Sequence, residues 1–251
     1  MCYFCIKPYE KRKKMKIKLL GTSHGFPEKD RFCSCNVITV NGSHYVIDAG
    51  VSLFSILLHN GYDCEDVKGI FITHMHGDHA SGLVEFVDLM SWGKRCVKPE
   101  IFVPTVAGKL AIQMLAEAMD HAREIEMKVY TEGAVFEDEN IRVTAFRTGH
   151  GEATFGFLVE AEGKKVYFTG DMKKDISDMP EFVYNEKTEL IICESAHNCM
   201  PKIADKFNNM KTDRIVINHI APKHSIAEFK EAKPLINKPF DLAFDGMEIE
   251  L

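Results

Sequence analysis

Three histidines and one aspartate lie within six consecutive positions, in the stretch His74-Met-His-Gly-Asp-His79. Imidazole nitrogens and carboxylate oxygens are the ligands that bind Zn²⁺ and related divalent ions. His74 and His76 are two residues apart, so in an extended backbone both rings project to one side and can reach one ion. Asp78 and His79 follow Gly77, and we expect a positive φ at this glycine to turn the chain back. The spacing therefore predicts two adjacent metal sites.

Four side chains are too few for two catalytic sites, because a catalytic zinc ion typically has three protein ligands and an open position for water. Three further metal-capable residues, His150, Asp171 and His219, each follow an apolar segment with a strand pattern. Functional residues are often mounted where a strand gives way to a loop. Asp171 has two carboxylate oxygens and could bridge two ions. Any one of the three alone is more typical of a hydrogen-bonded core or turn residue, but the seven residues together predict a metal centre.

Short apolar segments alternate with amphipathic ones along most of the chain. Strand patterns occur at residues 16–20, 36–40, 44–48, 69–73, 101–103, 141–148, 155–160, 165–169, 190–194 and 215–218. Helical patterns occur at residues 51–60, 82–91, 105–122, 178–185, 202–210 and 226–235. Asn41-Gly42 predicts a hairpin turn, and Thr105 is a candidate N-cap. No linker interrupts the pattern, so we expect one domain over residues 15–251, with two sheets in the middle and helices outside.

The composition is that of an ordinary globular protein, with 45% hydrophobic and 27% charged residues in a chain of 251. No apolar run approaches the roughly 18 to 20 residues that span a bilayer, and the first twenty residues lack the apolar segment of a secretory signal. We therefore expect a cytoplasmic protein that does not bind membranes. The eight cysteines are expected to be reduced thiols there. Cys2 and Cys5 have zinc spacing but no second such pair.

Charge is distributed unevenly. Residues 1–20 carry seven Lys or Arg and one Glu, a net charge of +6, which leaves −12 on the rest of a chain whose total is −6. An acidic body gains nothing from counterion release on a polynucleotide. The basic run at residues 11–18 could supply a local nucleic-acid patch, but residues 1–14 are more typical of a solvated basic tail. A small-molecule partner is thus favoured over nucleic acid, and a homodimer is left open.

The segments that hold these residues resemble the metallo-β-lactamase-fold hydrolase superfamily over residues 15–251. The matching motifs are Val46-Ile-Asp-Ala-Gly50, Thr73-His-Met-His-Gly-Asp-His79, His150, Thr169-Gly-Asp171 and Asn218-His219. The resemblance implies an α/β fold, a four-layer αββα sandwich, with a binuclear site at one edge of the two sheets. It implies that one divalent ion is held by His74, His76 and His150 and a second by Asp78, His79 and His219, with Asp171 between them. Asp48 is implied to orient the ligand loop without binding metal, although a simple turn aspartate fits its position equally. Zn²⁺ is the expected ion, and Mn²⁺ or iron suits the same ligands.

Three segments resemble the phosphodiesterase branch of this superfamily, which includes ribonuclease Z and the cyclic phosphodiesterase of carbon-phosphorus lyase pathways. They are Leu20-Gly-Thr-Ser-His-Gly-Phe-Pro27, residues 150–157 and Phe244-Asp-Gly-Met247. Ribonuclease Z has a histidine where this chain has Cys193. It also carries an inserted tRNA-clamping arm, and the intervals between the motifs in this chain are too short for one. The cyclic phosphodiesterase has a histidine slightly further on, and Glu194-Ser-Ala-His197 is similar to that arrangement. This likeness implies His197 as general acid, with Glu194 orienting it.

These observations predict a binuclear metal-dependent hydrolase that cleaves small or cyclic nucleotide-like phosphodiesters through a metal-bridging hydroxide. Asp78, His197 and Glu194 are the residues expected to act in catalysis. His24 and His224 are interpreted as solvated residues at the rim. Because the fold and metal set are shared by several activities, a thioesterase or lactonase, or a ribonuclease Z-like endonuclease that processes tRNA 3′ ends, are the alternatives.

Overall fold

Two seven-stranded sheets lie face to face in the computed structural model, which describes residues 14–91, 98–119 and 126–251. The first sheet has the strand order β14-β1-β2-β3-β4-β5-β6. Its strands are β1 (Lys16–Gly21), β2 (Cys35–Val40), β3 (Ser43–Ile47), β4 (Val67–Phe71), β5 (Glu100–Val103), β6 (Met127–Val129) and β14 (Met247–Glu250). Strands β3 to β6 are parallel to one another, whereas β14, β1, β2 and β3 pair antiparallel.

The second sheet has the order β13-β12-β11-β10-β9-β8-β7. Its strands are β7 (Gly133–Glu137), β8 (Arg142–Arg147), β9 (Phe155–Ala161), β10 (Lys164–Phe168), β11 (Leu190–Glu194), β12 (Ile215–Asn218) and β13 (Phe240–Leu242). Strands β10 to β13 are parallel, and β9 is antiparallel to both β8 and β10. Strands β8, β10, β11 and β12 therefore all end at the same edge of this sheet.

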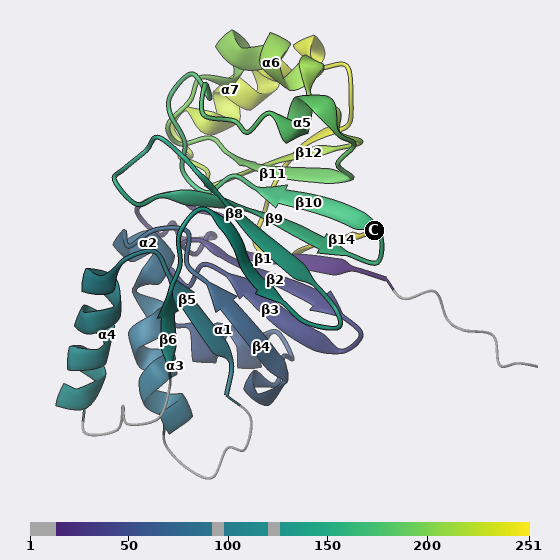
Figure 1. The fold of residues 1–251 in the computed structure, drawn as a ribbon. Coiled ribbons are helices and arrows are strands. Elements are labelled where there is room, and N and C mark those ends of the chain that lie inside the picture. The colour runs from purple at the N-terminus through teal and green to yellow at the C-terminus, as the bar shows by residue number, and fades with distance from the viewer. Residues whose placement is uncertain (1–13, 92–97, 120–125) are drawn as a thin grey trace, which may run out of the picture.

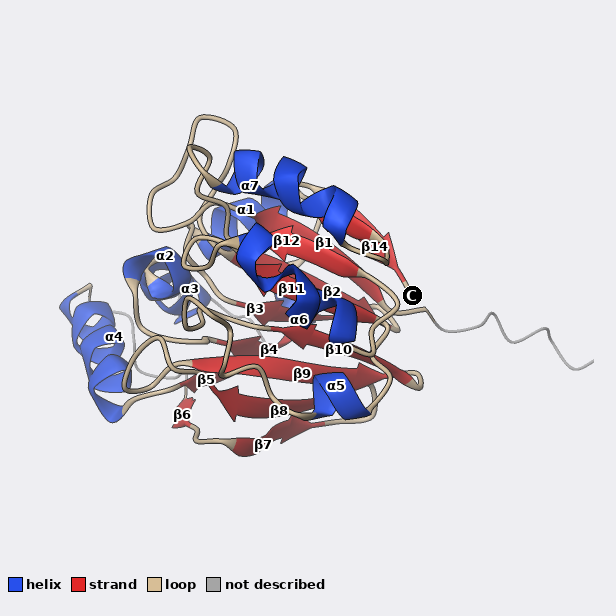
Figure 2. Ribbon diagram, turned by 90° about the horizontal axis from the view of Figure 1, so that it is seen from above, coloured by secondary structure: helices blue, strands red, loops and turns tan. Residues whose placement is uncertain are grey.

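Helices cover the outer face of each sheet. Figure 1 shows α1 (Leu53–His59), α3 (Gly82–Ser91) and α4 (Val106–Ala118) on one side of the two sheets, and α5 (Phe182–Asn185), α6 (Ala204–Asn209) and α7 (Ser225–Ala232) on the opposite side. The short helix α2 (Gly77–Ala80) lies at one end of the strands, as the second view shows (Figure 2). Single 3₁₀ turns occur at Cys64–Asp66, Met200–Ile203 and Lys233–Leu235.

Three groups of buried apolar side chains hold these layers together. The central group fills the space between the sheets and includes Phe71 and Phe102, whose rings stack at 5.2 Å. A second group joins the first sheet to α1, α3 and α4, and a third joins the second sheet to α5, α6 and α7. Each sheet therefore buries both faces, which explains why its central strands are apolar throughout. The predicted four-layer αββα sandwich is confirmed.

Most predicted elements are present, and two sequence features that predicted a turn and a helix start have the expected conformation and contacts. The Asn41-Gly42 turn has φ of 54° and 84°, the pair of positive angles that a tight hairpin needs. The Thr105 side chain accepts a hydrogen bond from Gly108 N at 2.9 Å, so it caps α4. The helix predicted at residues 105–122 ends at Ala118, and its last residues from 120 on lie outside the described part.

Four strands, the short helix α2 and several helix boundaries differ from the sequence-based expectation. Strands β6, β7, β13 and β14 were not predicted; β6 and β13 have three residues each, too few for a periodic pattern. Helix α5 starts at Phe182 instead of 178, because Pro180 interrupts the segment and the Asp178 carboxylate is occupied by Gly149 N and Lys173 N.

The predicted basic tail, together with Cys2 and Cys5, lies outside the described residues apart from Lys14, whose ammonium pairs with Glu250 at 2.9 Å. In the part of the chain that the structure describes, each helix is too short or too polar to cross a membrane.

Candidate metal centre

The seven predicted ligands all lie at one edge of the two sheets. His74 and His76 follow β4 in the first sheet, and Asp78 and His79 lie in α2 directly after them. His150, Asp171 and His219 follow β8, β10 and β12, which end at the same edge of the second sheet. Side chains from four separate loops therefore meet where the carboxyl ends of parallel strands come together, as sites in α/β proteins commonly do.

The turn that presents Asp78 and His79 forms differently from the prediction. Gly77 is not among the residues with positive φ, and it begins helix α2, which is closed by hydrogen bonds from His79 N and Ala80 N to His76 O at 3.0 Å. The expectation of a positive φ at Gly77 was therefore wrong. A single helical turn reverses the chain instead.

Glycine is required at Gly50, where the loop after β3 meets α2. A Cβ atom there would lie 1.7 Å from the Asp78 carbonyl oxygen, well inside van der Waals contact. Ser34 N and Ala49 N donate to the carbonyls of Asp78 and His79 at 3.0 and 2.7 Å. The backbone of the ligand helix is thus docked directly onto neighbouring loops, which fixes the positions of its side chains.

Potential ligand atoms gather in two main groups, and a third group, of Asp171, His197 and His219, overlaps them. His74, His76, His150 and Asp171 each offer one atom, and these atoms lie within 4.8 Å of one another; Asp78, His79 and His219 form a second group by the same measure. His74 Nε2 lies 3.0 Å from His76 Nδ1, and His219 Nε2 lies 3.1 Å from both His79 Nε2 and Asp78 Oδ2. These are the two sets that the resemblance implied.

Asp171 stands between the groups. Its Oδ2 lies 3.6 Å from His74 Nε2, and its Oδ1 lies 3.4 Å from His79 Nε2. Asp171 Oδ1 and His219 Nδ1 are both buried and have no hydrogen-bond partner within the described residues. Buried polar atoms are normally paired, so this convergence of nitrogen and carboxylate oxygen atoms fits bound cations.

Burial and neighbouring charges tune these groups. Burial, aided by the adjacent His79, lowers the pKa of His74 to about 2, so its ring is neutral and keeps a lone pair for a metal. Burial also lowers the pKa of His150. Burial would raise the pKa of Asp78, but hydrogen bonds from His219 and His79 outweigh it and hold that pKa below its usual range. Neutral imidazole at His74 and His150 and ionised carboxylate at Asp78 are the protonation states that metal ligands need. At His79, by contrast, burial is outweighed by the Asp48 and Asp171 carboxylates, which raise the pKa.

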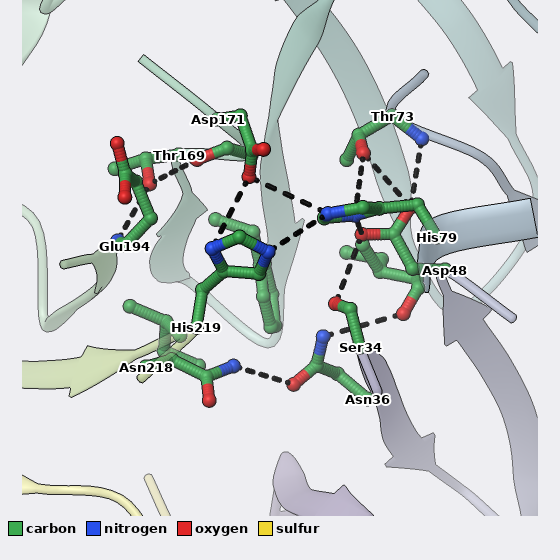
Figure 3. Close-up of a pocket in the computed structure, with 14 residues that line it drawn as sticks. Ser34, Asn36, Asp48, Thr73, His79, Thr169, Asp171, Glu194, Asn218 and His219 are labelled. Carbon is green, nitrogen blue, oxygen red and sulfur yellow. Dashed lines mark hydrogen bonds and ion pairs between the residues drawn. The ribbon is translucent and has the colours of Figure 1, made fainter. Parts of the chain in front are cut away.

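Asp48 lies behind the ligand loop and accepts four hydrogen bonds (Figure 3). Thr73 donates to it from N and Oγ1, both at 2.9 Å, and Ser34 Oγ donates at 3.1 Å. His79 Nδ1 lies 2.7 Å from the second carboxylate oxygen, which leaves Nε2 directed at the ligand group. The contacts are those of a residue that orients a metal-binding histidine.

His197 lies at the open side of the two groups. Its Nδ1 is 3.4 Å from Glu194 Oε2 and 3.7 Å from Asp171 Oδ2, and its ring lies 4.4 Å from that of His150. Glu194 ends β11 and is buried, and its carboxylate also accepts from His197 N at 3.0 Å. The nearby Glu194 carboxylate, opposed by partial burial, raises the pKa of His197.

Two spaces flank the centre. An inner cavity of about 30 Å³ lies between the sheets, where Asn218 Nδ2 donates to Asn36 Oδ1 at 3.3 Å (Figure 3). An open pocket of about 260 Å³ lies on the other side and is lined by His76, Asp78, His150, Asp171, His197 and His219, together with His24 and His224. His224 is exposed and His24 is half-buried, and both line the open pocket, which agrees with the prediction that they lie at its rim.

Solved structures share this architecture. The metallo-β-lactamase-fold protein YhfI from Bacillus subtilis matches with a TM-score of 0.76 at 15% identity, covering 94% of this chain and 99% of that one. The short form of human tRNase Z, ELAC1, matches with a TM-score of 0.73 at 23% identity, covering 93% and 98%. These likenesses show that the chain has the metallo-β-lactamase fold.

Sequence comparison refines this assignment. Ribonuclease Z from Anoxybacillus flavithermus is 32% identical over 151 residues, which are 58% of this chain and 48% of that protein. The chain thus matches about half the length of this curated relative. A family model described as anti-Pycsar protein Apyc1 matches residues 15–220, and the chain belongs to that family.

Proposed function

We propose that this protein is a phosphodiesterase that binds two divalent ions, Zn²⁺ by preference, and cleaves small or cyclic nucleotide-like phosphodiesters. The observation that carries the proposal is the position of Asp171 between two groups of ligand atoms that point toward each other. When bound, two close divalent ions lower the pKa of a water molecule toward neutrality and neutralise charge on a phosphodiester. His74, His76 and His150 would hold one ion, and Asp78, His79 and His219 the other, with Asp171 shared.

The remaining groups have separate tasks. Asp78, besides its ligand role, faces the open pocket, where its carboxylate would help to orient the attacking water. His197 faces the same pocket, and its raised pKa favours the protonated ring that a general acid needs. Cleavage of a phosphodiester expels an alkoxide, which His197 would protonate as the P–O bond breaks. Glu194 would hold that ring through its contacts with Nδ1 and the backbone N–H of His197.

The size of the pocket and the net charge of the chain beyond residue 20 support a small substrate. A space of about 260 Å³ is slightly smaller than the roughly 300 to 1,000 Å³ typical of small-molecule sites. The chain beyond residue 20 carries a net charge of −12, which would oppose a polynucleotide approaching from several sides.

A second candidate is ribonuclease Z-like cleavage of tRNA precursors, favoured by the identity to ribonuclease Z over more than half of the chain. Thioester or lactone hydrolysis is a third activity that the same fold could support, and it would need no strong general acid.

A leaving-group series tests the proposal. Protein loaded with two equivalents of Zn²⁺ or Mn²⁺ should cleave methyl p-nitrophenyl phosphate and methyl phenyl phosphate faster than a thioester, a lactone or a tRNA precursor with a 3′ trailer. His197→Ala should lose about 10² to 10⁴ in rate with the poorer phenol leaving group and much less with p-nitrophenol. His59→Ala, at the exposed end of α1, is the matched histidine control and should behave as wild type. An equal loss with both leaving groups would remove His197 as general acid, and faster tRNA or ester cleavage would overturn the phosphodiesterase proposal.

A further inference from the structure

The loop between β1 and β2 is braced at its base by Asp245. One carboxylate oxygen accepts from Thr22 N at 2.9 Å and from Thr22 Oγ1 at 2.6 Å, and the other accepts from Phe32 N at 2.6 Å. Arg31 Nη1 adds bonds to Thr22 Oγ1 at 2.6 Å and to Ala243 O at 2.8 Å. Both ends of residues 22–32 are therefore fixed to the segment that contains the Phe244-Asp-Gly-Met247 motif.

The tip of this loop reaches the ligand groups. His24 N donates to Ile220 O at 3.2 Å, next to the ligand His219. A Cβ atom on Gly25 would lie 3.9 Å from Asp78 Oδ2, so the backbone there passes directly beside a ligand carboxylate. The imidazole of His24 and the backbone of Gly25 form one wall of the open pocket.

Phe26 is the next residue, and its ring is 75% exposed. Ser23 Oγ donates to Phe26 O at 2.6 Å, which closes the tip into a turn. The Phe26 ring meets the His24 ring edge-on, with centroids 6.1 Å apart and planes at 77°. Single exposed apolar residues are common on protein surfaces. Phe26 differs because a braced loop holds it one residue from the wall of the pocket.

We infer that Phe26 is the surface on which an aromatic base of the substrate stacks while the phosphodiester lies at the ligand groups. This inference depends on the proposed phosphodiesterase function. Gly25, directly before Phe26, passes beside the Asp78 carboxylate, and the His24 ring that Phe26 contacts lines the same pocket. A base on Phe26 and a phosphodiester at the ligand groups would therefore occupy adjacent parts of one surface. Stacking on an aromatic side chain is worth about 1–3 kcal/mol per base and does not depend strongly on which base is bound. The enzyme should therefore select nucleotides over base-free diesters and tolerate several bases.

The test compares two diesters that differ in the base. One is a nucleoside 3′,5′-cyclic monophosphate, and the other is methyl riboside 3′,5′-cyclic phosphate, in which methoxy replaces the base. In metal-loaded protein, Phe26→Ala should raise KM for the cyclic nucleotide about 5- to 100-fold and leave kcat/KM for the base-free diester within twofold. Phe26→Trp should retain the wild-type KM. Phe244→Ala removes another exposed phenylalanine, on the bracing segment, and should leave KM and kcat/KM for both diesters unchanged.

Each possible result either supports or overturns the proposed role of Phe26. An equal change for both diesters, no change for either, or the same change in Phe244→Ala would overturn the role of Phe26. If wild-type protein cleaves neither diester, the proposed function fails. In that case, calorimetry measures the affinities for a nucleoside 5′-monophosphate and for ribose 5-phosphate, and this comparison tests the role of Phe26 independently of catalysis. Phe26→Ala must weaken nucleotide binding more than sugar-phosphate binding, and equal weakening or none would refute stacking.

Discussion

The two sheets contribute to the candidate centre in different ways. The first sheet supplies His74, His76, Asp78 and His79 from one continuous segment after β4, whereas the second sheet supplies His150, Asp171 and His219 from three separate strand ends. In the first region, local chain geometry and a docked helical turn bring the ligands together. In the second, they meet only because β8, β10 and β12 end at one edge. The assembly of the centre therefore depends on the packing of the two sheets as well as on the local motif.

The largest effect is expected at Asp171, which joins the two regions. Asp171→Asn removes the charge that lies near His74, His79, His150, His197 and His219. Phosphodiester cleavage should fall at least about 10³-fold, since shared metal ligation is worth several kcal/mol of charge stabilisation. Steady-state kinetics in saturating Zn²⁺ measures this loss. A decrease of less than tenfold would mean that the two regions function without the bridge.

Gly50 tests how strongly the first region depends on backbone docking. Gly50→Ala places a methyl group 1.7 Å from Asp78 O, so the ligand helix must shift, and we expect a loss of about 3 kcal/mol in the free energy of unfolding. Gly77→Ala is the matched control. Its Cβ would meet nothing within 4 Å and its φ is not positive, so its stability should equal or slightly exceed that of wild type. Urea denaturation of both variants gives the comparison, and a strongly unstable Gly77→Ala would contradict the observed helical turn.

Orientation of a single ligand is expected to have a smaller effect. Asp48→Asn weakens the hold on His79 Nδ1, and metal affinity should fall about 10- to 100-fold. The counterpart in the second region is Glu194→Gln, whose side chain contacts Met172 N and His197 but no predicted ligand side chain. Its metal affinity should stay within threefold of wild type. Competition with a chromophoric chelator measures both affinities, and equal losses would show that the two carboxylates share one role.

The sequence allowed the first region to be predicted more completely than the second. Four candidate ligands in one motif were recognisable from residue spacing alone. His150, Asp171 and His219 were recognisable as polar ends of apolar strands, but which ligands group together came from the family resemblance, because strand order is not encoded in local periodicity. His24 and Phe26 escaped functional interpretation for the same reason: the Asp245 brace that places them connects residues more than 200 positions apart. Gly77 was misjudged because glycine permits a positive φ without requiring it.

The smallest effect is expected at the far end of the first sheet. Hydrogen bonds from Lys16 and Lys14 lower the pKa of Glu250 to about 2. The folded pKa is below the unfolded value, so the stabilisation is present above about pH 4.5 and is lost as pH falls toward 2. Glu250→Gln should lower Tm by about 2 °C or less at pH 7, because both partners are exposed. The Tm difference between wild type and Glu250→Gln should become smaller toward pH 3 and in about 0.5 M salt, and metal content should be unchanged. A Tm difference that increases as pH falls would contradict the stabilising role of the ion pairs of Glu250.

Metal content per chain tests the central claim most directly. Elemental analysis of dialysed, Zn²⁺-loaded protein should find two ions in wild type and about one in both His150→Ala and His219→Ala, because each variant disrupts a different group. At most one ion in wild type, or two ions retained in both variants, would contradict a centre built from two groups around Asp171.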